Sequence, residues 1–152
     1  MTSQPRLEDD DLSLHLTDFS PHRVHNVPTY HFRMVHTGTG EELGGINLRI
    51  ASTPHIERYA GHIGFTVHPA HRGHRYAARS LRLLMPIARQ NGLDDLWITC
   101  DPENAASRRT LDLAGAHFVE IVDVPEDCII HRSGHTKKCR YLLPCAQNGA
   151  NL

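Results

Sequence analysis

The sequence predicts an α/β (α+β) fold with a mixed, mostly antiparallel central sheet of about six to seven strands and helices on both faces. Three observations lead to this expectation. The chain has 152 residues, the usual size of a single compact domain. Its first half contains segments that alternate apolar and polar residues, as strands with one buried face do. Its second half alternates short strands with segments whose apolar residues have helical spacing.

Strands dominate the first half of the chain. LSLHL at residues 12–16 and YHFRMVH at 30–36 alternate apolar and polar positions, so each is expected to bury one face. The turn TGTGEE joins the second of them to LGGINLRI at 43–50, which predicts a hairpin. AGHIGFTVH at 60–68 is rich in β-branched and aromatic residues and ends before Pro69, which cannot donate a hydrogen bond to a sheet.

Helices enter in the second half of the chain. Residues 76–90 predict a helix because their apolar positions share one face, and Gly92 supplies its end. The remaining elements are a strand at 96–100, a helix within 101–115, and strands at 116–124 and about 138–143. The second helix is expected to be capped by Asp101 or Asn104 and to end at Gly115.

The two ends of the chain have few apolar groups to bury. Residues 1–10 and 146–152 are therefore expected to be disordered tails around a domain at 11–145. The start resembles no secretory signal and no apolar run spans a membrane, so we expect a cytoplasmic protein without a membrane partner. A formal net charge of -1 gives no general reason to bind nucleic acid, and the four cysteines are expected to be free thiols.

The loop HRGHRYA at residues 71–77 is the most informative segment. It joins an expected strand to an expected helix, where Gly73 and backbone N–H groups meet the positive end of the helix dipole. Arg72, His74 and Arg75 add positive charge. The loop therefore predicts a site for a small anion such as a diphosphate, with a solvated connection as the alternative when the loop is taken alone.

Two longer stretches resemble the GNAT superfamily of N-acetyltransferases. IGFTVHPAHRGHRYAARSL is similar to its acetyl-CoA-binding core, a strand ending in V-x-P and then R-G-x-G-x-A at the start of a long helix. ITCDPENAASRRTLDLAGAHFV resembles the next unit of the family, which leads through N-x-x-S or N-x-x-A into a helix that closes on glycine. The resemblance covers residues 30–143, and VDVPED followed by KKCRY resembles an uncharacterised bacterial subgroup.

The resemblance implies a cleft for acetyl-CoA, the co-substrate, between two parallel strands that splay apart, residues 60–68 and 96–100. The cofactor contacts that it implies are Phe65, Val67, Arg72, Gly73, His74, Arg75, Tyr76, Ala77, Asn104 and Ser107. Two positions depart from the family pattern. Arg75 stands at the second loop glycine, and Leu111 stands where many members carry a tyrosine that protonates the leaving thiolate.

The implied reaction is direct transfer of an acetyl (acyl) group from acetyl-CoA to a primary amine of a small molecule or peptide. Such an amine arrives as ammonium and needs a base. We expect His62 in this role because many relatives carry glutamate there, with a histidine hydrogen-bonded inside the sheet as the alternative. His68 and Glu57 are reserve candidates.

Two further residues are candidates for catalysis. Tyr141 can replace the missing tyrosine as acid, the alternative being a core tyrosine with an exposed hydroxyl. Cys100 lies where the splayed strand ends, so it is either a covalent acyl carrier or a buried inert thiol.

Other classes of function stay open at this point. Arg75 and Leu111 favour a non-catalytic acyl-CoA-binding or regulatory module. A metal-linked interaction domain would use Cys128, His131, His135, Cys139 and Cys145, but their spacing matches no familiar zinc pattern and no metal is expected. Few residues precede Tyr30, so the acceptor site is expected to be open or completed by the partner subunit of a homodimer.

Overall fold

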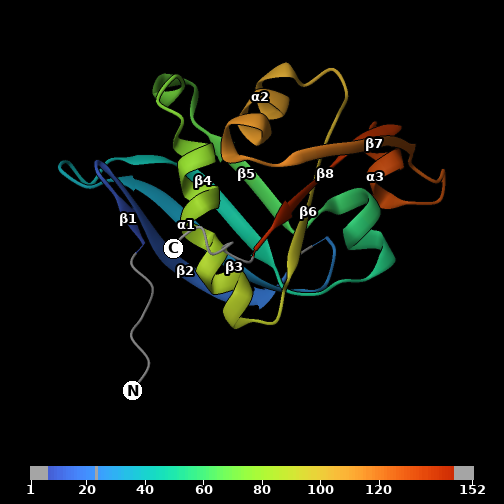
Figure 1. Cartoon of the computed structure of the whole chain (residues 1–152), viewed down its shortest axis with the longest axis horizontal. Helices are drawn as coiled ribbons and strands as arrows, with labels where there is room; N and C mark the ends of the chain where they lie inside the picture. Colours follow the sequence, from blue (N-terminus) through green and yellow to red (C-terminus); the bar gives the residue numbers. More distant parts are fainter. Residues whose placement is uncertain (1–6, 23, 146–152) are drawn as a thin grey trace.

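Two antiparallel sheets lie next to each other in the computed structural model, which describes residues 7–22 and 24–145 (Figure 1). The first sheet has five strands in the order β1-β2-β3-β4-β5, and the second has three in the order β6-β8-β7. The predicted mixed α/β fold is confirmed. Because the strands divide between two sheets, each sheet is smaller than the six to seven strands expected.

The first sheet is built from consecutive antiparallel neighbours. Its strands are β1 (Glu8–Asp9), β2 (Leu12–Pro21), β3 (Pro28–His36), β4 (Glu42–Arg49) and β5 (Ile63–Val67). The predicted hairpin is confirmed as β3 and β4, in which Phe32 lies opposite Ile46. Ile46 in turn lies opposite Phe65 of β5, and alternation along β4 buries Ile46 and Leu48 completely.

The strand β1 lies in a segment that was expected to be a disordered tail. Glu8 and Asp9 pair with β2, and Arg79 binds both Asp9 of this strand and Asp11, two residues beyond it. The Nε atom of Arg79 donates to Asp9 Oδ2 and its Nη2 donates to Asp11 Oδ1, each at 2.7 Å. These ion pairs hold the N-terminal segment against α1 (Tyr76–Gln90), although the segment has few apolar groups to bury. Residues 1–6 and 146–152, the rest of the expected tails, lie outside the described residues.

The strand predicted to begin at residue 60 begins at Ile63 instead. A short π-helix, η1 (Ile56–Ala60), precedes it, and Gly61 follows with a positive φ of 78°. A Cβ atom at Gly61 would lie 3.0 Å from the backbone nitrogen of Thr99. Gly61 thus allows the chain to turn out of η1 while its backbone passes close to β6 (Asp95–Cys100).

The helices and the second sheet follow the predicted order. After β5 come η2 (Pro69–His71), α1 (Tyr76–Gln90), β6, α2 (Ala105–Ala114), β7 (His117–Asp123), α3 (Ile129–Arg132) and β8 (Lys137–Pro144). The predicted range of α1 matches its observed bounds, and α1 contacts α2 as well as the first sheet. Its buried face includes Leu81, Leu84 and Ala88, which join the core that both sheets share.

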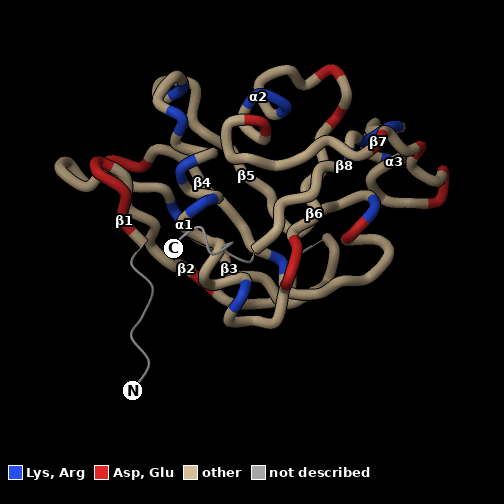
Figure 2. The backbone as a smooth tube through the Cα atoms, in the orientation of Figure 1, with Lys and Arg blue, Asp and Glu red and all other residues tan. Residues whose placement is uncertain are grey.

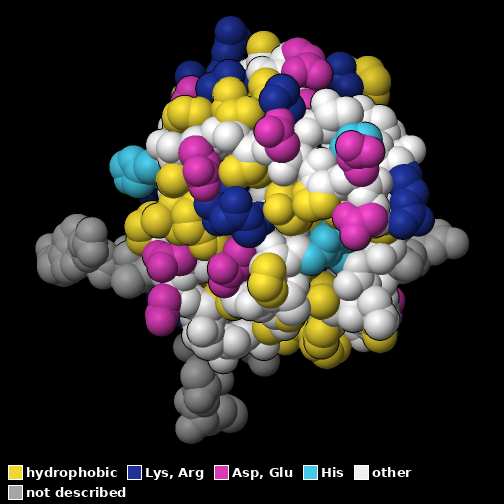
Figure 3. All heavy atoms as spheres, turned by 90° about the vertical axis from the view of Figure 1, so that its right-hand side faces the viewer, with side chains coloured by type: hydrophobic (Ala, Val, Ile, Leu, Met, Phe, Trp, Pro, Cys, Tyr) yellow, Lys and Arg dark blue, Asp and Glu magenta, His cyan; other side chains and the backbone are white. Residues whose placement is uncertain are grey.

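The edge strand β7 leaves apolar side chains in solvent. Phe118, Val119 and Ile121 are each close to half exposed. Figure 3 shows hydrophobic side chains gathered between charged ones on the side of the molecule that carries β7 and α3. A single apolar side chain at the surface is ordinary, but three on one edge strand give this side a mixed apolar and charged character.

The two sheets meet where β5 and β6 begin. The backbone nitrogen of His62 donates to the carbonyl oxygen of Trp97 at 2.6 Å. Beyond this contact, β5 and β6 do not pair with each other, and residues of both strands line a cavity. The strands therefore separate toward their ends, as the expected splayed pair should.

Candidate active site

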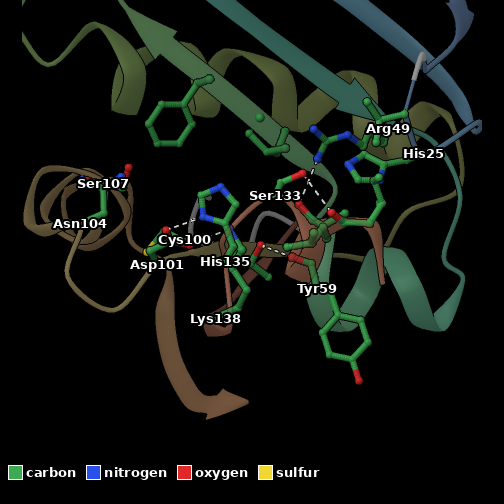
Figure 4. Close-up of a pocket in the computed structure, with 18 of the residues that line it drawn as sticks. His25, Arg49, Tyr59, Cys100, Asp101, Asn104, Ser107, Ser133, His135 and Lys138 are labelled. Atoms are coloured by element: carbon green, nitrogen blue, oxygen red, sulfur yellow. Dashed lines mark hydrogen bonds and ion pairs between the residues drawn. The ribbon is translucent and has the colours of Figure 1, made fainter. Parts of the chain in front are cut away.

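A cavity of about 390 Å³ opens where β5 and β6 separate (Figure 4). Its first wall is made by Ile63, Gly64 and Phe65 of β5, together with Thr99, Cys100 and Asp101 at the end of β6 and with Asn104, Ser107 and Leu111 of α2. Its second wall is made by the end of β4, the residues just before β5, and the segment from α3 to β8. Segments far apart in the sequence thus enclose one space.

The loop before α1 has the geometry of an anion site. Gly73 and Arg75 both have positive φ, at 95° and 61°. No side chain caps the start of α1, so its first backbone N–H groups have no side-chain acceptor. The side chains of Arg72, His74 and Arg75 are exposed, and Figure 2 shows basic positions along this loop and α1. Arg75 takes up a left-handed conformation, which glycine adopts more readily than other residues.

Two of the expected loop residues turn their side chains inward. Tyr76 and Ala77 are each 5% exposed, and the Tyr76 hydroxyl donates to Asp11 Oδ2 at 3.2 Å. At these two positions only backbone groups are available to an anion. The adjacent Arg79 binds the acidic residues of the N-terminal segment, so its charge is already compensated.

The expected cofactor residues on β5 and α2 divide into two groups. Phe65, Asn104 and Ser107 line the cavity, whereas Val67 packs against the core and is not among the lining residues. Asn104 Oδ1 accepts from the Ser107 nitrogen at 3.1 Å, which confirms Asn104 as the cap of α2. Leu111 is fully buried and lines the cavity, so this wall offers no proton donor where many relatives have tyrosine.

His62, the expected base, is fully buried and does not line the cavity. Its Nδ1 accepts from the Trp97 nitrogen at 2.9 Å, so its Nε2 carries the proton and donates to Ser52 Oγ at 2.9 Å. Burial, followed by the charge of Arg49, lowers the pKa of His62 to about 4. Both ring nitrogens are occupied, so the geometry favours the alternative of a histidine that is hydrogen-bonded inside the sheet.

Tyr141 and Cys100 are also poorly placed for the roles expected of them. The Tyr141 hydroxyl accepts from Arg108 Nε at 3.0 Å, and its ring packs edge-on against Phe118 under α2, away from the cavity. Cys100 does line the cavity, but burial and the neighbouring Cys139 raise the pKa of its thiol to about 11. A protonated thiol is a weak nucleophile, which favours the inert alternative.

The two reserve candidates lie outside the cavity as well. His68 Nε2 pairs with Glu42 Oε2 at 2.8 Å on the exposed side of the hairpin. Glu57 belongs to η1, and its carbonyl oxygen accepts from the Arg140 guanidinium. Neither residue is positioned to act on a molecule in the cavity.

A histidine and an aspartate that the sequence did not indicate as a pair do meet in the cavity. His135 Nδ1 lies 2.6 Å from Asp101 Oδ2, and Lys138 Nζ lies 3.0 Å from Asp101 Oδ1. Burial alone would raise the pKa of Asp101, but hydrogen bonds from Lys138 and His135 lower it below its ordinary value. Asp101 therefore stays ionised and holds the proton of His135 on Nδ1.

The other ring nitrogen of His135 is available for chemistry. Figure 4 shows the imidazole between Asp101 and the wall formed by β5, and no hydrogen bond in the described part of the chain engages its Nε2. The side chain is 45% exposed, so a molecule in the cavity can reach it. An oriented imidazole with a free Nε2 is the arrangement of a general base.

His25 forms the opposite end of the cavity, beside Arg49. Its Nδ1 lies 2.8 Å from His55 Nε2, and burial, followed by the charge of Arg49, lowers the pKa of His25 to about 3. This histidine is neutral at physiological pH. It is a poor candidate base because a group with such a low pKa accepts protons poorly.

The histidines and cysteines near the C-terminus do not gather into one cluster. Among residues 7–22 and 24–145, no group of three or more His, Cys, Asp or Glu side chains is placed to hold a metal ion. The four cysteines are free, as predicted. Within the same residues, no helix combines the length and apolar character needed to cross a membrane.

The separated strands with their cavity, and the uncapped helix start that follows β5, fit the scaffold that the family resemblance implied. The family model described as acetyltransferase (GNAT) domain matches residues 4–117. The match covers most of the chain, which therefore belongs to the GNAT acetyltransferase family. Acetyl-CoA is the co-substrate of this family, so the co-substrate expected from the sequence is confirmed. A search among curated proteins found no match.

Solved structures of similar fold are acetyltransferases. A GNAT acetyltransferase from Bacillus anthracis is 19% identical with a TM-score of 0.59, over 77% of this chain and 67% of that one. Microcin C7 self-immunity acetyltransferase, solved with acetyl-CoA and AMP, is 13% identical with a TM-score of 0.59, over 76% of this chain and 61% of its own. Ribosomal-protein-S5-alanine acetyltransferase from Vibrio fischeri is 12% identical with a TM-score of 0.61, over 78% and 63%.

Proposed function

We propose that this protein is an N-acetyltransferase that moves the acetyl group of acetyl-CoA directly to the primary amine of a small molecule or peptide. The observation that carries the proposal is the His135–Asp101 pair inside the cavity between β5 and β6. Two structural relatives support this range of acceptors, since one confers microcin immunity and the other acts on an alanine of ribosomal protein S5.

The proposed path of acetyl-CoA follows the two strands. Its pyrophosphate binds the backbone N–H groups of residues 72–77, with Arg72, His74 and Arg75 close by in solvent. Its pantetheine arm runs along β5 past Phe65, opposite Asn104 and Ser107 of α2. The thioester then lies in the cavity, where the acceptor reaches it.

The proposed chemistry uses His135 as the base. Its Nε2 removes one proton from the ammonium form of the acceptor while Asp101 holds Nδ1 and stabilises the imidazolium that forms. The neutral amine attacks the thioester carbonyl carbon, so a C–N bond forms and the C–S bond breaks. The leaving thiolate takes the second amine proton, which gives the amide and free CoA, and His135 returns its proton to solvent.

A comparison of two histidine variants tests this proposal. In a screen of amines for CoA release, His135→Gln should lower kcat by roughly 10²- to 10⁴-fold, the usual contribution of a general base. Acetyl-CoA should still protect this variant against thermal unfolding, because the variant leaves the cofactor residues in place. The control is His117→Gln on β7, which is exposed and lies outside the cavity, and which should keep full activity.

Two results would argue against the proposal. Full turnover by His135→Gln would show that His135 is not the general base. Protection by acetyl-CoA without CoA release to any amine would instead favour the non-catalytic acyl-CoA-binding module. The homodimer expected from the sequence remains a prediction, which sedimentation of the purified protein can test.

A further inference from the structure

Arg49 is a buried cation without an acidic partner. It is the last residue of β4, it is 8% exposed, and no ion pair reaches it within residues 7–22 and 24–145. Its Nη1 donates to the neutral carbonyl oxygens of Ala60 and Gly61, at 3.0 and 2.8 Å. Its Nε is buried without a hydrogen-bond partner in this part of the chain. Burying a charge in this way is unfavourable unless another group compensates for it.

The guanidinium faces the cavity, where a ligand can supply that compensation. Arg49 is a lining residue, and Figure 4 shows its guanidinium extending from β4 toward the interior of the cavity. Gly64 makes room for it, because a Cβ atom there would lie only 2.8 Å from Arg49 Nη2. Burial lowers the pKa of Arg49 only to about 10, so the group remains cationic at neutral pH.

The other charges of the cavity leave Arg49 available for an anion. The remaining charged lining residues are Asp101 and Lys138, which pair with each other at 3.0 Å. Asp101 is further engaged by His135. The cavity therefore contains one compensated pair and one uncompensated guanidinium.

The position of Arg49 points to the acceptor rather than to the phosphates of the cofactor. It lies beside Gly61, where β5 and β6 meet, while the uncapped start of α1 follows the far end of β5. Its remaining donors, Nε and Nη2, lie on one edge of the planar group, an edge that matches the two oxygens of a carboxylate. A ligand bound there would lie at the end of the cavity that His25 and Arg49 line.

We propose that Arg49 binds a carboxylate of the acyl acceptor, so that the substrate is a small amine that also carries a carboxylate, such as a free amino acid. This inference rests on the proposed acetyltransferase function. It predicts that the cavity selects acceptors by a negative group, while His135 acts on their amine. In this arrangement Asp101, paired with Lys138, orients His135, and neither residue binds the substrate carboxylate.

Matched pairs of acceptors test the inference on the wild-type protein. Free amino acids and their amides, for example phenylalanine and phenylalaninamide, differ in the carboxylate and share the amine. In a CoA-release assay, the acids should have kcat/KM values higher by roughly 30-fold or more, the scale expected when one partner of a buried charge pair is removed. Equal values for acids and amides would overturn the inference while leaving acetyl transfer intact.

Two variants then assign the preference to Arg49. Arg49→Met should abolish the preference mainly by raising KM for the acids, and Arg49→Lys should retain part of it. The control is Arg33→Met, which removes an exposed arginine of β3 that pairs with Glu42 and should keep the preference. Thermal protection by acetyl-CoA shows which variants are folded.

The outcomes separate the two proposals. A folded Arg49→Met or Arg49→Lys protein that keeps the full preference for acids would overturn the role of Arg49. Acetylation of other amines, but of neither the acids nor the amides, would overturn the inference alone. Protection by acetyl-CoA without CoA release to any amine of the screen would overturn the proposed function, and the inference with it.

Discussion

Arg75 has a backbone conformation that side chains rarely adopt. Its φ is 61° and its ψ is 27°, a left-handed conformation that costs about 1–2 kcal/mol for a residue with a Cβ atom. Glycine avoids this cost but loses roughly 0.5–1 kcal/mol in backbone entropy. We therefore expect Arg75→Gly to leave the free energy of unfolding unchanged or to raise it slightly.

A neighbouring arginine in the same loop provides the control for this prediction. Arg72 has an ordinary φ of -71°, so Arg72→Gly brings only the entropic cost. Urea unfolding should show Arg75→Gly to be more stable than Arg72→Gly by about 1 kcal/mol. Equal stabilities would mean that the left-handed residue is not strained.

The sequence predicted well those features that depend only on neighbouring residues. The cap at Asn104 and the exposed loop with Gly73 depend on neighbours within a few positions. The pairing of Asp101 with His135 depends instead on β6 lying beside β8, where Cys100 is opposite Cys139. The sequence offered two separate signals, Asp101 directly after one predicted strand and His135 shortly before another. Only the pairing of those two strands brings the two residues together.

The orientation of His62 could not be predicted for a similar reason. The family resemblance suggested a base at this position, but the direction of its ring is set by the Trp97 nitrogen and by Ser52, on either side of it. Arg49 was missed because an arginine at the end of an alternating strand is ordinarily solvated. Only the return of the chain through η1 encloses its side chain.

At the scale of elements, Gly44 lets β4 and β5 come together along the strand that is proposed to hold acetyl-CoA. A Cβ atom at this position would overlap the carbonyl oxygen of Thr66 and would lie 2.9 Å from Val67 Cα. Both obstacles are backbone atoms, so the strands would have to separate. We expect Gly44→Ala to lower the free energy of unfolding by about 1–3 kcal/mol, as overpacked cores do, and to weaken binding of acetyl-CoA.

The adjacent glycine is the matched control. A Cβ atom at Gly45 would lie 3.5 Å from the Phe32 carbonyl oxygen, which is an ordinary contact. Gly45→Ala should therefore be neutral or stabilising by up to about 0.5–1 kcal/mol, because glycine weakens a strand interior. Chemical unfolding and titration with acetyl-CoA measure both effects. Similar losses in the two variants would contradict the packing argument.

Elements with a clear periodicity were predictable, and those without one were not. The helix α1 and the β3–β4 hairpin follow from apolar spacing and a glycine-containing turn. The strand β1 has two residues and is held by Arg79, more than sixty positions away in the chain. The π-helix η1 precedes the predicted strand and shares only Ala60 with it, and η1 packs against β6 and β8, which lie far along the chain.

Across the whole molecule, His62 links the two sheets and makes the fold sensitive to acid. The pKa of its ring is about 4 in the folded protein, compared with the ordinary 6.5 when the chain is unfolded. Above pH 6.5 the ring is neutral in both states and its contribution is fully present. Between pH 6.5 and about 4 only the unfolded chain takes up the proton, so unfolding becomes more favourable as the pH falls.

The expected loss from His62 over this interval is on the order of 3 kcal/mol, in a protein of ordinary marginal stability. His25, whose pKa is about 3, contributes in the same direction over a wider range.

Urea unfolding between pH 7 and pH 4 should therefore show a falling free energy of unfolding. His62→Gln should be less stable at pH 7 yet lose less on acidification, because it removes the titration of His62. The exposed His117→Gln should keep the slope of the unchanged protein, and an equally steep slope in His62→Gln would show that another group controls acid unfolding.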